Sequence, residues 1–404
     1  MISERHAPLG LALVFAFTVF LLALFTVHNN AFREVSAITA KEEFRFLKND
    51  ILEHVRNSTL GFQEILVLNL PKRTDRKDAM ILAAVHTNIK PKWIDGVDGN
   101  DVLDLTLPLR PHQSPPSRAS KGSWRAHLNA LRSVVENDIS SVLILEDDLD
   151  WDIHLKDQLF NFSLACRTLI QPLLPGPHDN ETQIVPLYIE QTYPPPRTDQ
   201  HNYGLPLEAR YPTIPPHTSP YGDTWDVLWL GHCGMLMPSA FTPGHSSMRI
   251  RYTDTTVPAR SNLDTNRSGS ELIDAYPDHT RVVHHAFIPV CSLAYAVSQR
   301  GARRILYELS VRNYTSEYDN MLRELCDGEE MREGKLVCLT AQPAYFSHWR
   351  ERGWRGKDSD IDVVGDDDEW REEGRSVNIR WSVRRNMGVF HEGEAVAWVD
   401  QWPD

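Results

Sequence analysis

The sequence is poor in cysteine and lacks the short motifs by which many metal and nucleotide sites are identified. Its 404 residues include only five cysteines. None forms a CxxC pair or lies in a His/Cys cluster, so a zinc site is not indicated. A P-loop and a GxGxxG sequence are both absent, which removes the two commonest glycine-rich phosphate loops. No internal repeat is present, which excludes a solenoid or propeller.

Excess positive charge is also missing. The formal net charge is −13, and a nucleic-acid partner would call for a basic face, so no nucleic acid is expected. The composition, 41% hydrophobic and 24% charged, is typical of a globular protein. A chain of this length is enough for one large domain or two ordinary ones.

One long apolar run is present near the N-terminus. Residues 9–27 contain no charged side chain, and nineteen helical residues at about 1.5 Å each nearly span a hydrocarbon core of about 30 Å. A cleaved signal peptide is the alternative, but its apolar region is shorter and ends in a small-residue cleavage site, which His28-Asn29-Asn30 does not provide. We expect an uncleaved signal-anchor, hence a single-pass type II membrane protein of the Golgi or ER with its catalytic domain in the lumen.

Glycosylation sequons and cysteines agree with a secretory location. The sequons are Asn57, Asn161, Asn180, Asn266 and Asn313, and each marks a potential acceptor in a lumenal protein. An oxidising lumen would allow two disulfides and one remaining thiol. Cys326 and Cys338 could close a small loop, and Cys233 could anchor a tight turn, but the pairing does not follow from the sequence.

The order of elements predicts an α/β domain that begins at about residue 62. An apolar strand over 64–70 is followed by a helix capped by Thr74 or Asp75 and by a second strand over 90–96, which is the start of a nucleotide-binding fold. Further elements are expected along the chain. They are a helix from Ser123 as N-cap to Val135, a strand over 142–146, a helix over 157–170, strands over 184–189, 225–230, 282–288 and 292–298, helices from Ser298 and Tyr318, and a strand over 336–341.

The expected organisation has five parts. Residues 1–8 form a short cytoplasmic tail, 9–27 the anchor, 28–61 a stem, 62–361 the catalytic domain with an irregular Pro-rich excursion over 172–260, and 362–404 an acidic tail. This tail carries Trp370, Trp381, Trp398 and Trp402. We expect those rings to pack back on the domain.

The strand over 142–146 runs directly into acid. Five carboxylates fall within the seven positions from Glu146 to Asp152. A buried strand that ends in polar residues opens into a site at its carboxyl end. Carboxylates this close repel one another unless a cation neutralises them, and their oxygens suit Mg²⁺ or Mn²⁺ beside a substrate phosphate. An exposed acidic turn is the alternative interpretation of this stretch.

Several blocks together resemble glycosyltransferase family 25. They are Val67-Leu68-Asn69-Leu70-Pro71-x-Arg73-x-Asp75-Arg76, Lys121-Gly122-Ser123-Trp124-x-x-His127, Ile144-Leu145-Glu146-Asp147-Asp148, Ala294-Tyr295-Ala296-Val297-Ser298-x-x-Gly301-Ala302, Tyr318-Asp319 and Ser359-Asp360-Ile361. The resemblance covers about residues 62–150 and 285–361. The block around His127 departs from the family, which usually has a small residue and Leu-Ser-His there.

The resemblance implies a GT-A type, Rossmann-like α/β sandwich with a mixed, mostly parallel sheet. It also implies Mn²⁺ (or Mg²⁺) and a UDP-sugar as donor, with inversion at the anomeric carbon and transfer of a hexose, galactose as a guess, to a glycan or glycoprotein acceptor. The site residues that follow are Asn69, Arg73, Arg76, Asp95, Glu146 and Asp147 for the donor, Asp147 and Asp148 for the metal, Asp319 as base, and His127 and His348 as support.

Each assignment has a plainer alternative. The arginines could be surface charge, Asp319 a helix cap, and His127 a packed core histidine, while Asp150 and Asp152 are expected to be loop acids. The whole chain could also be a membrane-tethered carbohydrate-binding or scaffold protein on an inactive transferase fold.

Overall fold

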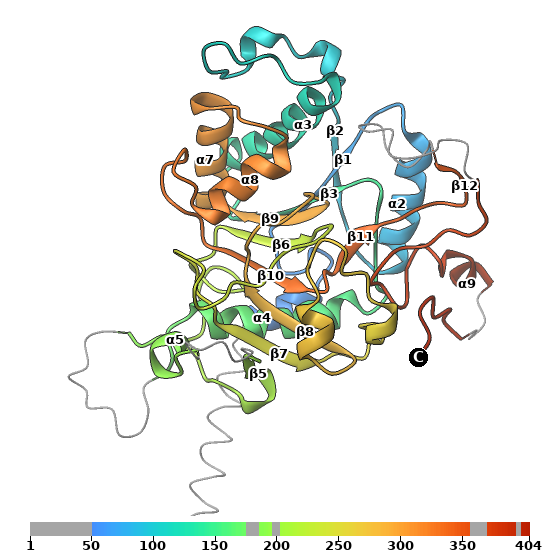
Figure 1. The fold of residues 1–404 in the computed structure, drawn as a ribbon. Coiled ribbons are helices and arrows are strands. Elements are labelled where there is room, and N and C mark those ends of the chain that lie inside the picture. Colours follow the sequence, from blue (N-terminus) through green and yellow to red (C-terminus); the bar gives the residue numbers. More distant parts are fainter. Residues whose placement is uncertain (1–50, 175–185, 196–202, 356–369, 393–396) are drawn as a thin grey trace, which may run out of the picture. The chain divides into compact units, whose positions relative to one another are not determined.

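The first strands of the chain build the parallel part of a large sheet (Figure 1). The structure, a computed structural model, describes residues 51–174, 186–195, 203–355, 370–392 and 397–404. The expected anchor and most of the expected stem lie outside this range, as do the Asn180 sequon and the Ser359-Asp360-Ile361 block. Residues Ile51–Asp404 form one compact unit.

The strands and helices have the following bounds. The strands are β1 Glu64–Asn69, β2 Lys92–Asp95, β3 Ser141–Glu146, β4 Leu149–Trp151, β5 Leu205–Pro206, β6 Val227–Gly231, β7 Arg249–Thr253, β8 Thr280–His285, β9 Ala294–Ser298, β10 Cys338–Gln342, β11 Phe346–His348, β12 Gly353–Trp354 and β13 Trp370–Arg371. The α-helices are α2 Thr74–His86, α3 Arg118–Glu136, α4 Leu155–Ile170, α5 Ile189–Thr192, α6 Glu271–Ala275, α7 Gln299–Tyr307, α8 Tyr318–Asp327 and α9 Met387–Glu392. Short 3₁₀ or π turns are η1 Ile51–Arg56, η2 Gly99–Asp101, η3 Asp104–Thr106, η4 Leu207–Ala209, η5 Arg260–Asn262 and η6 Glu308–Arg312.

Eleven strands form one mixed sheet with the order β2-β1-β3-β9-β6-β10-β8-β7-β5, to which β11 and β4 are added beside β6. Strands β4, β8 and β9 run against the other eight. The prediction of an α/β fold with a mixed, largely parallel sheet is therefore confirmed.

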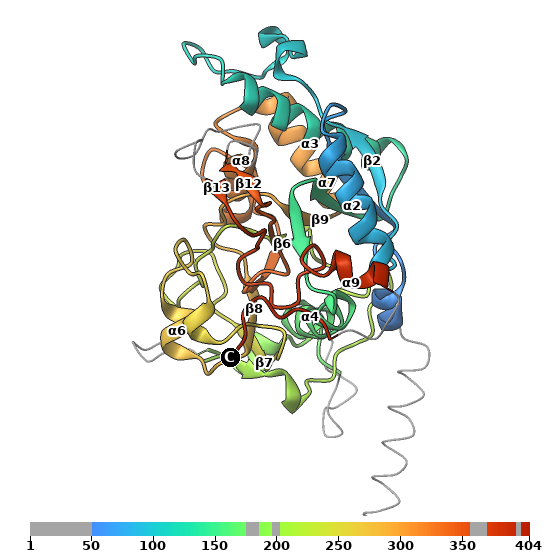
Figure 2. The ribbon, with the colours of Figure 1, turned by 90° about the vertical axis from the view of Figure 1, so that its right-hand side faces the viewer.

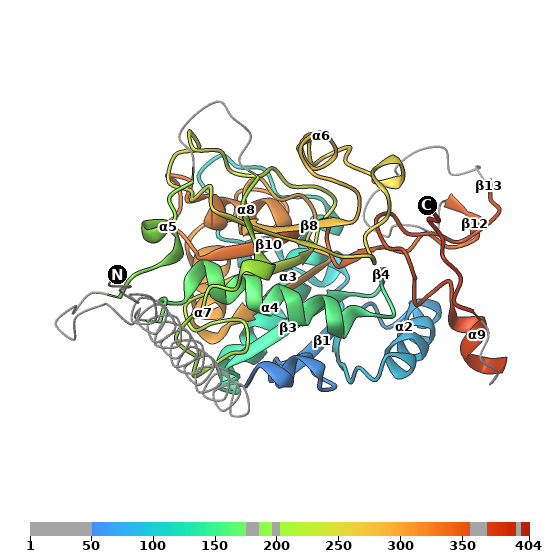
Figure 3. The same ribbon diagram turned by 90° about the horizontal axis from the view of Figure 1, so that it is seen from below.

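Helices cover both faces of this sheet. Alternate residues of β1 point to opposite sides: Leu66 and Leu68 join a core with α3, α7 and α8, whereas Ile65 and Val67 join a core with α2 and α4. Figure 3 shows α4 lying along the second face. Burial on both faces explains why the central strands are continuous apolar runs rather than alternating ones. Figure 2 shows α9 beside α2, where Phe390 stacks on His86.

Two of the expected elements differ in the structure. Helix α3 starts at Arg118 with Ser117 as its N-cap, so Ser123 lies inside the helix and is not a cap. The apolar spacing begins only at Trp124 because the first turns are polar. The expected strand over 184–189 is wrong at its described end, where Ile189 begins the single-turn helix α5. Short apolar runs do not distinguish these two states.

The tail tryptophans also differ from expectation. Trp381 and Trp402 are partly buried, but Trp370 and Trp398 keep 44% and 43% of their surface exposed. These two rings are more exposed than expected, although the Trp398 ring contacts Phe390 of α9 at 4.9 Å. Within the described part of 172–260, β6 confirms the strand expected over 225–230, and β5 and β7 are further strands.

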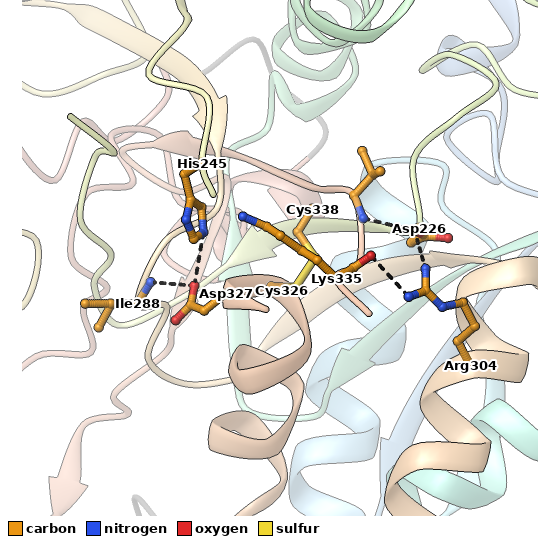
Figure 4. The surroundings of a disulfide bond; sticks show 9 residues. Asp226, His245, Ile288, Arg304, Cys326, Asp327, Lys335 and Cys338 are labelled. Carbon is orange, nitrogen blue, oxygen red and sulfur yellow. Dashed lines mark hydrogen bonds and ion pairs between the residues drawn. A yellow bond between two sulfur atoms is a disulfide. The ribbon is translucent and has the colours of Figure 1, made fainter. Parts of the chain in front are cut away.

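Two disulfides and one free thiol are present. Cys326–Cys338 closes the loop between α8 and β10, with Lys335 and the pair His245–Asp327 beside it (Figure 4). Cys233–Cys291 ties the loop after β6 to the loop before β9. Cys166 is buried and unpaired. The expected number of bridges and both expected positions are confirmed.

Within the described part of the chain, no helix combines the length and apolar character needed to cross a membrane.

Three buried histidines lie where β6, β8 and β10 meet. His284 donates from Nδ1 to the carbonyl of His285 at 2.8 Å and accepts from Gln342 at Nε2, 3.1 Å away, so its neutral form is fully hydrogen-bonded. Burial lowers the pKa of His284 from 6.5 to about 3 and the pKa values of His232 and His285 to about 4. The folded protein therefore keeps these rings neutral where the unfolded chain would protonate them.

We expect the free energy of unfolding to fall as the pH drops from about 6.5 to about 4. Over this range the unfolded state binds protons that the folded state refuses, and each such proton is worth about 1.4 kcal/mol per pH unit. Urea unfolding at several pH values measures the slope. His284→Gln should make it shallower, whereas His112→Gln, at an exposed position, should not. An unchanged slope in His284→Gln would contradict this explanation.

Candidate active site

A pocket of about 520 Å³ opens at the carboxyl ends of β1 and β3. In the sheet, β1 lies between β2 and β3. The two strands that follow β1 in the chain are therefore added on opposite sides of it. Open α/β sheets bind ligands at such a point. The lining residues are Leu68, Asn69, Leu70, Lys72, Arg76, Gly96, Val97, Asp98, Gly99, Ser117, Arg118, Ala119, Gly122, Ser123, Ala126, His127, Glu146, Asp147 and Asp148.

Asp147 is held by two side chains from the β1–α2 segment. Arg76 donates to its Oδ1 at 2.8 Å and Asn69 to its Oδ2 at 2.7 Å. Burial and the neighbouring Asp148 raise the pKa of Asp147 in spite of Arg76. Asn69 also donates to the carbonyl of Arg73 at 3.1 Å. The first and third sequence blocks thus meet in one buried hydrogen-bonded unit.

Asp148 differs from Asp147 because one of its oxygens has no partner. Its Oδ2 lies 3.5 Å from Arg76, but its Oδ1 is buried without a hydrogen bond. Burial would raise the pKa of this carboxyl, yet His348, Arg76 and Arg350 outweigh burial and hold the pKa below its usual value. An ionised carboxylate with an unused oxygen at a pocket wall is a suitable ligand for a divalent cation.

Among the described residues, no group of three or more His, Cys, Asp or Glu could hold a metal ion. Two neighbouring carboxylates still suit Mg²⁺ or Mn²⁺, which commonly bind through one or two carboxylates and take their other ligands from phosphate and water. The residues present fit such an ion, with Asp148 as the better ligand, because both oxygens of Asp147 are already occupied.

Glu146 belongs to a separate buried network. Its carboxylate accepts from Ser292 at 3.1 Å and lies 3.6 Å from Nε2 of His127. Nδ1 of His127 contacts the hydroxyl of Tyr295 at 2.9 Å, and that hydroxyl contacts Tyr318 at 2.8 Å. The His127 ring also stacks on the Tyr318 ring at 4.1 Å. His127 thus lines the pocket and is also a packed, hydrogen-bonded residue.

The remaining pocket wall carries positive charge and a helix start. Lys72 lines it from the β1–α2 loop. Arg118, the first residue of α3, donates to Asp98 at 2.8 Å. The amino end of a long helix favours anions through its unpaired N–H groups and its dipole. A Cβ at Gly122 would lie 2.5 Å from the carbonyl of Val97, so only glycine lets α3 approach this loop.

Four expected site residues do not line the pocket. Arg73 makes a double hydrogen bond with Asp75, and Asp95 ends β2 as an exposed residue. Asp319 accepts from the backbone N–H of Cys291 at 2.9 Å. His348 ends β11 and acts on Asp148 electrostatically. Lys72, Asp98, Arg118 and Ser292 were missed by the sequence analysis. Of these four residues, only Lys72 lies inside one of the sequence blocks that resemble the family, the block over 67–76.

Asp150 and Asp152 are not loop acids. Both are fully buried and accept hydrogen bonds from the C-terminal segment, by which we mean residues 370–392 and 397–404. Ser376 donates to Asp150 at 2.6 Å, and the backbone N–H of Trp381 donates to Asp152 at 3.0 Å. Ser376 and Trp381 lie more than 200 residues from these acids in the sequence, beyond the reach of a local pattern.

Arg384 fastens the same segment directly behind the acidic turn. Its guanidinium donates to the carbonyls of Asp147 and Leu149, at 3.3 and 3.2 Å, and its backbone N–H donates to Asp150 at 3.2 Å. Between these points, the carbonyl of Asp148 accepts from Trp349 at 2.7 Å. The backbone that presents Asp148 is therefore fixed on both sides.

No family model matches the chain. It is 29% identical over 113 residues to "Procollagen galactosyltransferase 1" of Danio rerio, covering 25% of this chain and 19% of that protein. It is 26% identical over 111 residues to "Procollagen galactosyltransferase 2" of Homo sapiens, covering 25% and 18%.

A third similar protein is "Inactive glycosyltransferase 25 family member 3" of Homo sapiens, which is 28% identical over 115 residues, covering 26% of this chain and 19% of that protein. Each match thus spans about a fifth of the relative's length. The identities to the galactosyltransferases and to the inactive member are nearly equal, so the percentages alone do not separate an active from an inactive protein.

Arg384→Gln is expected to loosen the acidic turn. Two buried carbonyls would lose their donor, at a cost of about 1–3 kcal/mol each in the free energy of unfolding. Hydrogen exchange at the Trp349 amide should also become faster. The matched control is Arg385→Gln, which removes only the contact with exposed Glu373 and should cost less than about 1 kcal/mol. Equal effects of the two changes in both measurements would show that Arg384 does not fasten this turn.

Proposed function

We propose that the chain is a member of glycosyltransferase family 25 and acts as a metal-dependent, inverting glycosyltransferase of the GT-A type, a proposal supported by the similarity to the three relatives. It moves a hexose, with galactose as the first candidate, from a UDP-sugar to a hydroxyl of a glycan or glycoprotein. The single observation that carries the proposal is the pairing of the acidic turn with Arg76 and Asn69 in a pocket at the carboxyl ends of β1 and β3.

The charges of the pocket suit a nucleotide diphosphate. Lys72 and Arg76 supply cationic groups on one wall, and the amino end of α3 supplies backbone N–H groups on another. Phosphate oxygens favour such donors. Asn69 and Arg76 hold Asp147, and this keeps Asp148 at the pocket wall. His127 and Ser292 hold Glu146, which leaves its partly exposed carboxylate facing the pocket.

Mn²⁺ or Mg²⁺ would be held by Asp148, with Asp147 beside it. Such an ion supplies a Lewis acid that offsets the charge developing on a departing diphosphate. The chain's own contribution is to hold the pKa of Asp148 below its usual value through His348, Arg76 and Arg350, and to fix its backbone through Trp349 and Arg384.

Asp319 is given a different role from the one that the resemblance implies. Inversion requires a base beside the acceptor hydroxyl, but Asp319 accepts the N–H of Cys291 outside the pocket. The next residue, Ser292, donates to Glu146. In this proposal Asp319 holds the turn that orients Glu146 and does not itself remove the proton.

A lumenal location forms part of the proposal. The two disulfides suit an oxidising compartment. Asn57 and Asn266 are exposed sequons, whereas Asn313 is 6% exposed and accepts from Arg110. We propose a type II anchor over residues 9–27 and glycosylation at the exposed sequons rather than at Asn313.

Asp148→Asn is the direct test. The wild-type chain should bind UDP only with Mn²⁺ or Mg²⁺ and should hydrolyse a UDP-sugar slowly without an acceptor. The variant should lose about 10²-fold or more in that hydrolysis, because a metal ligand is removed. Asp104→Asn, which removes an exposed carboxylate paired with Lys121, is the control for net charge and should behave as wild type.

Calorimetric titration with UDP and assay of a panel of UDP-sugars give the two measurements. Metal-dependent UDP binding that survives in Asp148→Asn would refute the metal assignment. UDP binding without turnover of any UDP-sugar would favour the alternative, a carbohydrate-binding or scaffold protein on an inactive transferase fold.

A further inference from the structure

The C-terminal segment forms a second pocket of about 550 Å³. This size lies within the range of about 300–1,000 Å³ that is usual for small-molecule sites. All but one of its lining residues come from the last part of the chain, which matches no block of the family resemblance. They are Arg355, Trp370, Arg371, Glu372, Glu373, Gly374, Arg375, Arg385, Val399, Asp400, Gln401 and Trp402.

One residue, Trp349, contacts both the acidic turn and the second pocket. The backbone N–H of Trp349 donates to the carbonyl of Asp148, and the Trp349 ring packs on Gly374, where a Cβ would lie 2.4 Å from it. Gly374 lines the second pocket and Asp148 lines the first. An antiparallel bridge between Arg350 and Arg375 joins the same two regions.

The floor of the second pocket is rigidly attached to β4. Gln401 donates to the hydroxyl of Ser376 at 2.9 Å, and Ser376 donates to Asp150 at 2.6 Å. The indole N–H of Trp402 donates to the carbonyl of Ser376 at 3.0 Å, which fixes that ring. A molecule in this pocket would therefore sit at a defined place relative to Asp147 and Asp148.

The lining combines exposed aromatic surface with unused polar groups. Trp370 is 44% exposed and meets the 50% exposed Trp354 edge-on at 5.2 Å. In the described structure, the carboxylate of Glu372 and the guanidinium of Arg375 have no side-chain partner. A sugar ring presents an apolar C–H face that can stack on an indole, and hydroxyls around its rim that pair with carboxylate, guanidinium and amide groups.

We propose that this second pocket binds a sugar unit of the acceptor glycan. Trp370 supplies the stacking surface, and Glu372 and Arg375 supply partners for the hydroxyls. The acceptor role rests on the proposed function, whereas the binding of sugar does not. A peptide acceptor is less well served, because an extended peptide requires a run of free backbone groups or apolar side-chain pockets.

Saturation-transfer NMR on the full chain tests this with named probes, the methyl glycosides of galactose, glucose and mannose. At least one should show saturation of its C–H protons. Saturating UDP with Mn²⁺ should leave that signal unchanged, because the nucleotide occupies the first pocket. Trp370→Ala should weaken binding about ten-fold, the loss expected for one aromatic contact. Trp398→Ala removes an equally exposed indole outside the pocket and should have no effect.

Each outcome is decisive. Absence of a signal with all three glycosides, displacement by UDP, or full binding in Trp370→Ala would overturn the proposal, as would binding of a collagen-like peptide in place of the sugars. Metal-dependent UDP binding is measured on the same samples. If it is intact while the sugar signal is missing, only the acceptor pocket is wrong. If the sugar binds while UDP does not, the second pocket stands and the transferase proposal fails.

Discussion

Crowding of negative charge at the end of β3 is the constraint on which the site depends. Five carboxylates within seven positions could not remain ionised together without opposing charge or hydrogen bonds. The structure separates them. Asp147 accepts hydrogen bonds from Arg76 and Asn69. Glu146 accepts from Ser292 and lies near His127. Asp150 and Asp152 accept from donors in the C-terminal segment. Asp148 alone keeps a buried oxygen without a donor.

The C-terminal segment is therefore part of the site's construction. Its described residues add no strand to the large sheet, yet they donate to the buried Asp150 of β4 and to the carbonyls on either side of Asp148. A buried carboxylate without its partner costs several kcal/mol, so the acidic motif and this distant segment depend on each other. The same segment also supplies most of the lining of the second pocket, which Trp349 connects to the acidic turn.

The elements that the sequence predicted correctly are those that depend on residues close together in the chain. The strand β1, the helix after it, β2 and the acidic end of β3 were all recognisable, since each is an apolar run with its own stop signal. The sheet brings Asn69, Arg76 and Asp147, which belong to two different sequence blocks, into one hydrogen-bonded unit. Ser298 caps α7 as expected, through the N–H of Gly301.

Partners distant in sequence could not be predicted. The polar first turns of α3 carry no apolar spacing because they line the pocket, so the start of that helix was placed too late. The Arg73 side chain hydrogen-bonds to its neighbour Asp75, and Lys72 lines the pocket where Arg73 was expected. No sequence pattern near Asp150 or Asp152 indicates that Ser376 and Trp381 donate to them. Two acids that bind the C-terminal segment were therefore expected to be loop acids.

The chain is about equally identical in sequence to a galactosyltransferase and to an inactive relative. Catalysis is therefore inferred from the chemistry of the site. A scaffold protein gains nothing from a buried carboxylate oxygen without a donor, which costs about 1–3 kcal/mol or more. Arg76 and Arg350 keep Asp148 ionised, although a protonated acid would be less costly to bury. The fold thus maintains a charged, unsatisfied ligand at the wall of an open pocket, and a cation bound there would remove that cost.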